Sequence, residues 1–215
     1  MDNFQDLLAG YKHFRSHVYK KHSDLYSSLA EFGQKPKIMV IACVDSRVDP
    51  TTIFSAQPGE LFVLRNVANL VPPFESQFDC NSIAAAIQIG VEIIGIEMIL
   101  ILGHTSCGGV ATFIDNSNNQ SSKNSFINQW TSLLKVANNE LGIDKNNISK
   151  EAHCSALEKQ SIKQSIKNLN TYPFIKKKVK SGSLKVAGGY FDISKGELMT
   201  LNNKSDLFEV ANFDF

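Results

Sequence analysis

The 215-residue chain has few cysteines and almost no net charge. Four cysteines are too few to stabilise a fold of this length mainly by disulfide bonds, so we expect free thiols in a reducing compartment. A net charge of +1 gives no broad electrostatic field for nucleic acid or an anionic membrane. The longest strongly apolar stretch, residues 91–102, is interrupted by two glutamates and is too short to cross a bilayer. Since the first residues also carry no signal segment, we expect a cytoplasmic protein without a membrane or nucleic-acid partner.

Short apolar runs alternate with helical patterns along most of the chain. Three such runs predict buried parallel strands, at residues 37–43, 61–64 and 96–102. Helices are predicted between them and beyond, at residues 50–54, 82–94 and 149–170. Residues 184–193 and 197–201 flank a polar turn and predict a C-terminal hairpin. We expect an α/β fold, a central mostly parallel β-sheet flanked by helices, in a single domain over residues 1–215.

The N-terminal segment has a separate pattern. Residues 4–32 place apolar side chains three or four positions apart, which is the period of an amphipathic helix. Residues 1–33 are therefore predicted to form a helical arm. Such an arm must lie on an apolar surface, either of its own chain or of a neighbouring subunit.

Two short motifs carry the residues suited to chemistry. Cys43-Val44-Asp45-Ser46-Arg47 follows the first predicted strand, and Gly103-His104-Thr105-Ser106-Cys107-Gly108-Gly109 follows the third. Ligands bind beyond the carboxyl ends of parallel strands, so we expect the two motifs to meet. Two cysteines and one histidine with an open fourth position form a catalytic zinc pattern. The predicted ligands of one Zn²⁺ per chain are Cys43, His104 and Cys107.

Other residues with reactive or charged side chains have more than one possible role. Asp45 and Arg47 lie two apart in an extended loop and can form a bidentate pair, either to orient a metal-bound water or only to hold the loop. Cys80 and Cys154 are interpreted as inert core thiols. His153 beside Cys154 could form a second metal pair, but its polar helix favours a structural role.

The joint motif Cys-x-Asp-x-Arg followed by His-x-x-Cys-Gly resembles the β-class carbonic anhydrases. The chain is similar to their plant-like, non-allosteric subclass from Gln34 through Gly109, and again over residues 188–192. The resemblance implies reversible hydration of carbon dioxide to bicarbonate and a proton by zinc-hydroxide attack. It also implies a homodimer or dimer of dimers in which the N-terminal arm packs on the partner.

The resemblance assigns a role to each matching position. It implies zinc ligands at Cys43, His104 and Cys107 and a catalytic dyad of Asp45 and Arg47. It implies that substrate is bound by Gln34, by the apolar side chains of Phe62 and Val67, and by the backbone amide of Gly108.

Two positions depart from the pattern of the family, and a third differs from one of its other subclasses. Ile89 stands where the subclass has a pocket tyrosine, which puts any role of that hydroxyl in doubt, and Val44 stands where serine is more frequent. In another subclass the matching aspartate moves onto the metal when bicarbonate fills a separate pocket, which resembles one needing a tryptophan three residues before the first zinc cysteine. That position is Val40 here, so we expect Asp45 to stay off the metal.

Three other functions compete with this reading. A carbon disulfide or carbonyl sulfide hydrolase would use the same fold and the same attack. A non-catalytic zinc-binding regulator would need neither Asp45, Arg47 nor Gln34. A thiol redox protein using Cys43 and Cys107 lacks the Cys-x-x-Cys spacing of a dithiol pair.

Overall fold

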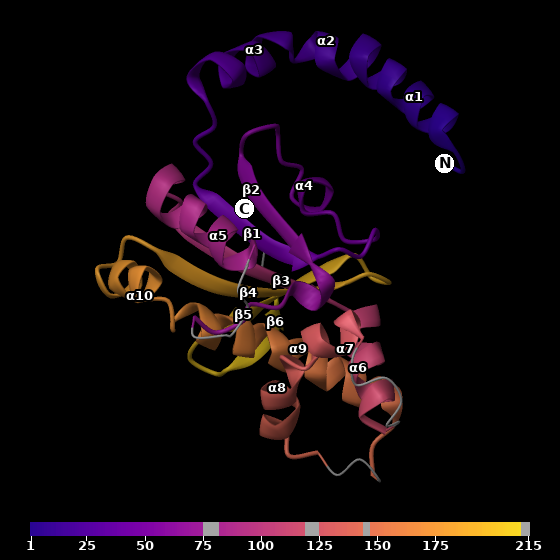
Figure 1. Ribbon diagram of the computed structural model, residues 1–215, viewed down its shortest axis with the longest axis vertical. Coiled ribbons are helices and arrows are strands. Elements are labelled where there is room, and N and C mark those ends of the chain that lie inside the picture. The colour runs from indigo at the N-terminus through magenta and orange to yellow at the C-terminus, as the bar shows by residue number, and fades with distance from the viewer. Residues whose placement is uncertain (75–81, 119–124, 144–146, 212–215) are drawn as a thin grey trace.

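The protein is described by a computed structural model covering residues 1–74, 82–118, 125–143 and 147–211. The described strands form one sheet in the order β2-β1-β3-β4-β5-β6 (Figure 1). Their bounds are β1 Ile38–Cys43, β2 Leu61–Asn66, β3 Met98–His104, β4 Lys185–Asp192, β5 Glu197–Asn202 and β6 Leu207–Val210. The first four strands pair in parallel, and β5 and β6 are added antiparallel. The predicted mostly parallel sheet and the hairpin are confirmed, and β6 extends the hairpin by a strand that was not predicted.

The helices that flank the sheet include the three that were predicted, at residues 50–54, 82–94 and 149–170. They are α4 Pro50–Ile53, α5 Ser82–Gln88, α6 Gly108–Asn118, α7 Phe126–Thr131, α8 Leu134–Glu140, α9 Lys150–Leu169 and α10 Pro173–Lys180. A short 3-10 turn, η2 Val67–Asn69, follows β2, and a π-helical turn, η3 Ile89–Ile94, continues α5. Asp49 and Ser149 cap α4 and α9 by accepting hydrogen bonds from backbone amides of the first turn.

Residues 116–125 are rich in Asn and Ser, which favours a polar surface loop, but the first of them are helical. Helix α6 continues through Asn118. Asn116 Nδ2 donates a hydrogen bond to Asn128 Oδ1 in α7, so a tertiary contact overrides the turn preference of this Asn-Ser-rich stretch.

Strand β1 lies at the centre of the packing. Met39 and Ile41 face a core cluster closed by α5, α9 and α10. Val40 and Ala42 face the other side of the sheet, in a smaller cluster that includes Leu102. Cys43, at the carboxyl end, belongs to a third cluster beneath α6 and α8. The metal-site motifs therefore lie at the edge of a well-packed core.

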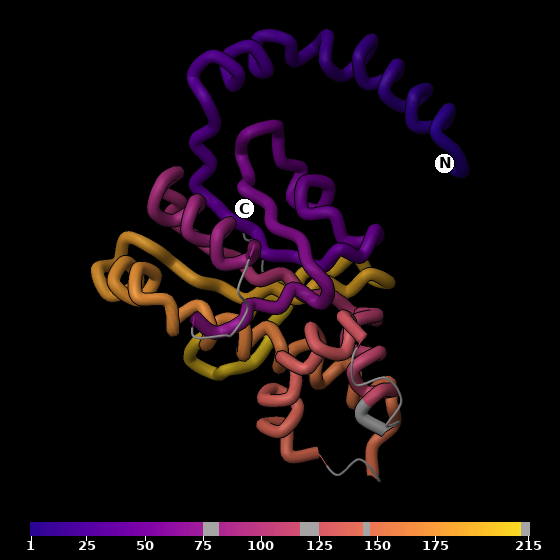
Figure 2. The backbone as a smooth tube through the Cα atoms, viewed as in Figure 1, coloured from indigo at the N-terminus to yellow at the C-terminus, as the bar shows by residue number. Residues whose placement is uncertain are grey.

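The N-terminal arm is helical as predicted, but it packs little on its own chain. It comprises α1 Phe4–His13, the π-helical η1 Phe14–Val18, α2 Tyr19–Lys21 and α3 Ser23–Phe32, and these helices bury no residue. Figures 1 and 2 show the arm extending away from the sheet, and Leu29 packs over Gly59 near its base. Phe4, Leu7 and Tyr11 are each more than half exposed. The apolar surface that the arm requires is thus not supplied by the described part of its own chain.

None of the described helices has both the length and the apolar character that crossing a membrane requires.

Candidate metal centre

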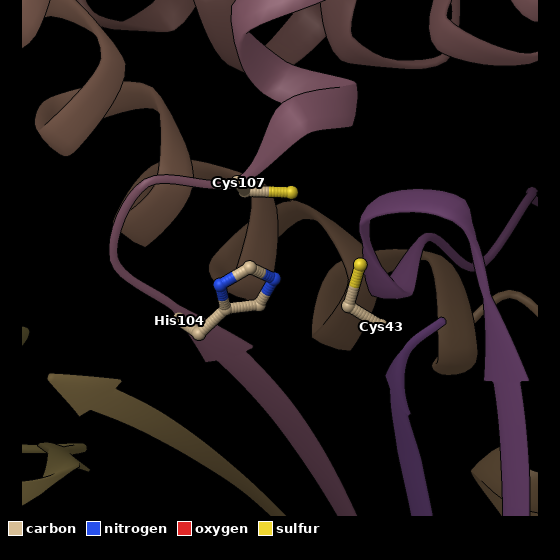
Figure 3. A group of neighbouring side chains, drawn as sticks. All are labelled: Cys43, His104 and Cys107. Atoms are coloured by element: carbon tan, nitrogen blue, oxygen red, sulfur yellow. The ribbon is translucent and has the colours of Figure 1, made fainter. Parts of the chain in front are cut away.

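Three predicted ligands converge at the carboxyl ends of two neighbouring parallel strands. Cys43 ends β1, His104 ends β3, and Cys107 precedes the first residue of α6. Their ligand atoms all lie within 4.8 Å of one another, and all three residues are buried (Figure 3). Residues 61 to 64 positions apart therefore meet because β1 and β3 are paired in parallel, as the sequence predicted.

The histidine is oriented for a metal. His104 Nδ1 lies 2.8 Å from the carbonyl oxygen of Thr105, to which it can only donate, so the lone pair remains on Nε2. That Nε2 is buried and has no hydrogen-bond partner. A buried acceptor without a partner is costly, and a metal ion between Nε2 and the two sulfurs would satisfy it. The donor set of two sulfurs and one nitrogen fits zinc.

The two thiols shift each other's pKa in opposite directions. A hydrogen bond from Cys107 is the largest of the effects that lower the pKa of Cys43 to about 4, against the opposing effect of burial. The same hydrogen bond and burial raise the pKa of Cys107. Backbone amides of Asp45 and Ala68 further stabilise the Cys43 thiolate, and those of Gly109 and Val110 act on Cys107 from the start of α6. A bound cation would favour the thiolate form of both cysteines.

Asp45 and Arg47 form the expected bidentate pair beside these ligands. Arg47 donates from Nε to Asp45 Oδ1 at 2.9 Å and from Nη2 to Oδ2 at 2.7 Å. The Arg47 amide adds a bond to Oδ1 at 3.0 Å, and Nη2 also donates to the carbonyl of Ser106 at 3.1 Å. The hydrogen bond from the Arg47 side chain is the main reason that the pKa of Asp45 lies well below its usual range. Asp45 is therefore an ionised, fixed acceptor.

A third charged residue, Arg65, holds the loop that carries Asp45. Its guanidinium donates to the carbonyl of Cys43 at 2.9 Å, to the carbonyl of Asp45 at 2.6 Å and to the Asp49 carboxylate at 3.2 Å. No role was predicted for Arg65 from the sequence. Its only signal in the sequence was a position directly after the predicted strand at residues 61–64, where a partly buried cation needs partners.

Val67 and Gly108 lie next to the metal ligands. A Cβ on Gly109 would stand 2.7 Å from Val67 Cγ1, so the η2 turn packs directly against the start of α6. Ala68 has a φ of 62°, a left-handed conformation that costs energy in a residue with a Cβ. Trp130 Nε1 donates to the Val67 carbonyl at 2.8 Å and helps to hold this turn. A Cβ on Gly108 would meet nothing within 4 Å, which leaves open space over its backbone.

Two predicted substrate residues lie at the other end of the sheet. Phe62 pairs in register with Met39, four residues before Cys43, which is about 13 Å along the strand. Gln34 is exposed and precedes β1, whose length alone is about 17 Å. Ile89, which occupies the predicted tyrosine position, is also at this end, since the neighbouring Gly90 packs against Phe62. One chain therefore does not bring Gln34 and Phe62 to its own metal ligands.

The remaining candidates fall outside the site. His153 Nε2 lies 2.7 Å from Asn138 Oδ1, and in the described part of the chain the group of possible metal ligands consists of Cys43, His104 and Cys107. Cys154 is a half-buried free thiol. Cys80 lies outside the described residues.

Comparison with known proteins agrees with this geometry. The sequence profile of the carbonic anhydrase family matches residues 38–198. The chain is 36% identical to "Beta carbonic anhydrase 3" of Arabidopsis thaliana over 197 residues, which are 91% of this chain and 76% of that protein.

Solved structures show the same fold. That of the β-carbonic anhydrase CcaA superposes with a TM-score of 0.90 at 28% identity, covering 98% of this chain and 92% of CcaA. A tetrameric β-carbonic anhydrase of Sordaria macrospora superposes with a TM-score of 0.82 at 27% identity, covering 94% of this chain and 98% of that one. With the metal ligands converging as described, these matches show that the chain belongs to the β-carbonic anhydrase family.

Proposed function

We propose that the chain is a zinc enzyme that hydrates carbon dioxide reversibly to bicarbonate and a proton. The observation that carries the proposal is the buried Cys43–His104–Cys107 cluster, with an unpartnered Nε2, beside an ionised carboxylate. Zinc held by this cluster would supply Lewis acidity, which lets water act as hydroxide near neutral pH.

Asp45 and Arg47 would orient the attacking water. An ionised carboxylate accepts hydrogen bonds only, so Asp45 would fix the water's proton and direct its lone pair to the carbon of carbon dioxide. Arg47 keeps both carboxylate oxygens in place, since it binds each of them. The dyad is a positioning device, and the proton released in the reaction leaves to bulk buffer.

The substrate would lie over the open backbone at the start of α6. The Gly108 amide, one of the unpaired donors of a helix N-terminus, would donate to the oxygen that gains charge. Val67 would form an apolar wall beside it. Gln34 and Phe62 would complete this pocket only if a second copy of the chain places them there.

A second copy is supported by two features of the single chain. The arm leaves large apolar side chains exposed, including Phe32 and Phe4, each at 68%. A groove of about 630 Å³, lined mainly by apolar residues that include Ile38, Phe54 and Leu61, is open near the base of the arm. We propose a homodimer or dimer of dimers in which Gln34 and Phe62 of one copy face the metal of the other.

Zinc analysis and a stopped-flow assay of carbon dioxide hydration test the proposal together. We expect about one zinc per chain. Alanine at any of the three ligands should remove metal and activity together, whereas Arg47→Ala should retain zinc and lose activity. Full activity in a stably metal-free preparation would overturn the proposal.

Mixed oligomers test whether Gln34 acts across chains. Gln34→Ala alone should lower kcat/KM by about one to two orders of magnitude with zinc retained. In an oligomer co-assembled from Gln34→Ala and Cys43→Ser chains, an intact metal site should meet an intact Gln34 from the other chain. We therefore expect more activity than either variant gives alone. Activity equal to the sum of the separate variants would show that Gln34 does not act across chains.

Two further statements are proposals of the same kind. We propose that residues 1–215 form one domain, with residues 1–33 as its arm, which limited proteolysis tests. A cytoplasmic location stays a prediction, which microscopy of the tagged chain tests.

A further inference from the structure

A buried carboxylate lies behind the metal loop and is not used by the proposed mechanism. Glu158, on α9, is only 4% exposed. Its Oε1 accepts a hydrogen bond from the Cys107 amide at 2.9 Å, and its Oε2 accepts one from the Tyr190 hydroxyl at 2.7 Å. Burying a carboxylate costs free energy unless hydrogen bonds such as these compensate. A buried glutamate at this position therefore indicates a specific role.

The turn that Glu158 contacts separates two metal ligands. Ser106, between His104 and Cys107, has a φ of 57°, in the left-handed region that residues with a Cβ rarely adopt. The turn is held before Ser106 by β4, because the Thr105 amide donates to the Phe191 carbonyl at 3.0 Å. After Ser106 it is held by Glu158, whose bond to the Cys107 amide fixes the peptide plane from which the Cys107 side chain departs.

Tyr190 fixes the carboxylate in turn. Tyr190 is only 1% exposed. It pairs in register with Gly103, the residue that directly precedes His104. A single carboxylate therefore links the sheet, helix α9 and the peptide of a metal ligand. Neither of the two hydrogen bonds to Glu158 is needed to form α9, because Cys107 and Tyr190 lie outside that helix. Neither is needed to form the sheet, because Tyr190 donates through its side-chain hydroxyl and not through its backbone.

We propose that Glu158 is a positioning residue of the metal site, which holds the Cys107 peptide so that its sulfur faces Cys43 and His104 before the metal binds. This rests on the zinc site of the proposed function. Groups that orient metal ligands in this way affect metal retention about 10–100-fold.

The surroundings of Glu158 make the proposal testable in a folded protein. A cavity of about 390 Å³ borders Glu158 and is also lined by Ser106, Ser155 and Tyr190. Water from this cavity can hydrate the Cys107 amide and the Tyr190 hydroxyl if the carboxylate is removed, but it cannot fix the peptide plane. Glu158→Ala should therefore fold with a loosened ligand, and Glu158→Gln should keep an acceptor for the Cys107 amide.

The experiment measures metal retention and metal geometry. The rate at which a chelator removes zinc is followed in the full-length holoenzyme, and the absorption spectrum of the cobalt-substituted protein reports the thiolate–metal geometry. Glu158→Ala should lose zinc about 10–100-fold faster and show a changed spectrum. Glu158→Gln should retain zinc within a few-fold of the parent, and Tyr190→Phe should lie between the two. Glu151→Gln, on the same helix and the same cavity, is the matched control and should behave as the parent.

The outcomes separate this proposal from the zinc site itself. If the parent protein bound neither zinc nor cobalt stoichiometrically, the proposed function would fail. If the parent bound metal and Glu158→Ala kept its zinc-loss rate and cobalt spectrum, the positioning role alone would be refuted. The role would also be refuted if Gln retained zinc no better than Ala, because a shared loss would point to packing or charge rather than to the hydrogen bond.

Discussion

Replacing Arg65 should lower the free energy of unfolding by more than the loss of its partly exposed salt bridge with Asp49 would. Arg65→Met keeps the aliphatic stem and removes three hydrogen bonds, to the carbonyls of Cys43 and Asp45 and to the carboxylate of Asp49. A hydrogen bond from a charged group contributes about 1.5–3 kcal/mol when buried. The Arg65 side chain is 28% exposed, so water replaces part of each bond, and we take about 1–1.5 kcal/mol for each carbonyl. The partly exposed pair with Asp49 adds less than about 1 kcal/mol.

The expected loss is therefore about 2–4 kcal/mol in the free energy of unfolding. Urea unfolding of the metal-free protein measures it, because bound metal would add its own stabilisation. The comparison is made at one protein concentration, since subunit association also stabilises. Arg65→Lys, which can keep one bond, should lose about half as much.

Asp49→Asn is the matched control for the Arg65 variants. It removes the charge pair but keeps a side chain that caps α4, so it should cost less than about 1 kcal/mol. The reasoning would be refuted if Arg65→Met cost less than about 1 kcal/mol, or if Asp49→Asn cost as much. Either result would mean that the two carbonyl bonds do not hold the loop.

Three further predictions follow from packing, charge and exposure. Gly109→Ala should cost about 1–3 kcal/mol of stability by urea unfolding, because the new Cβ would stand 2.7 Å from Val67 Cγ1. The pKa of Asp49 is lowered, chiefly by its hydrogen bond from a threonine hydroxyl, so its charge stabilises the fold above its ordinary pKa of 3.8. The stability difference between the parent and Asp49→Asn should therefore shrink as the pH falls from about 6 to 3. Removal of residues 1–30 should give a smaller species in sedimentation, because the arm's apolar side chains are exposed in the single chain.

Each of these has an outcome that contradicts it. Gly108→Ala, whose Cβ meets open space, is the stability control for Gly109→Ala, and equal losses would exclude the steric explanation. A pH-independent difference between the parent and Asp49→Asn would show that the carboxylate's charge does not stabilise the fold. An unchanged oligomer after deletion would refute a role of the arm in assembly.

The convergence of Cys43, His104 and Cys107 was predictable because each lies in or directly after a local sequence pattern. A nearly continuous apolar run predicts a buried parallel strand, and a buried strand points its carboxyl end at a site. Cys43 and His104 each end such a strand, and Cys107 follows His104 by three positions. These three positions required no knowledge of strand order beyond the parallel pairing of two runs.

The residues that support the ligands were not predictable, because their partners are distant in the chain. Glu158 lies 51 positions after Cys107, and within a polar helix it resembles a solvent-exposed glutamate. The separation of Phe62 from the metal depends on strand register, which pairs Phe62 with Met39 and which no local pattern encodes. Strand β6 has four residues after a turn at Asp206, too short a run for alternation to be recognised.

The last prediction concerns where the Asp45 carboxylate rests. Its two oxygens accept three hydrogen bonds from Arg47, and Arg47 is itself fixed by the carbonyl of Ser106. Val40, where an indole would be required for an anion pocket, is 1% exposed and packs with Ala42 in an apolar cluster. An anion placed there would be buried without that donor, at a cost of about 1–3 kcal/mol.

Bicarbonate therefore has no means of pulling Arg47 away from Asp45 at this position. We expect bicarbonate inhibition to be hyperbolic, and activity to fall gradually below neutral pH with the slope of a single proton. Steady-state kinetics across pH and bicarbonate concentration measure both. A steep, cooperative loss of activity, or a crystal structure near pH 7.5 with Asp45 as a metal ligand, would show that Arg47 does not hold the carboxylate. Arg47→Lys is the informative variant, because a lysine cannot bind both oxygens in the same plane and should allow Asp45 to leave.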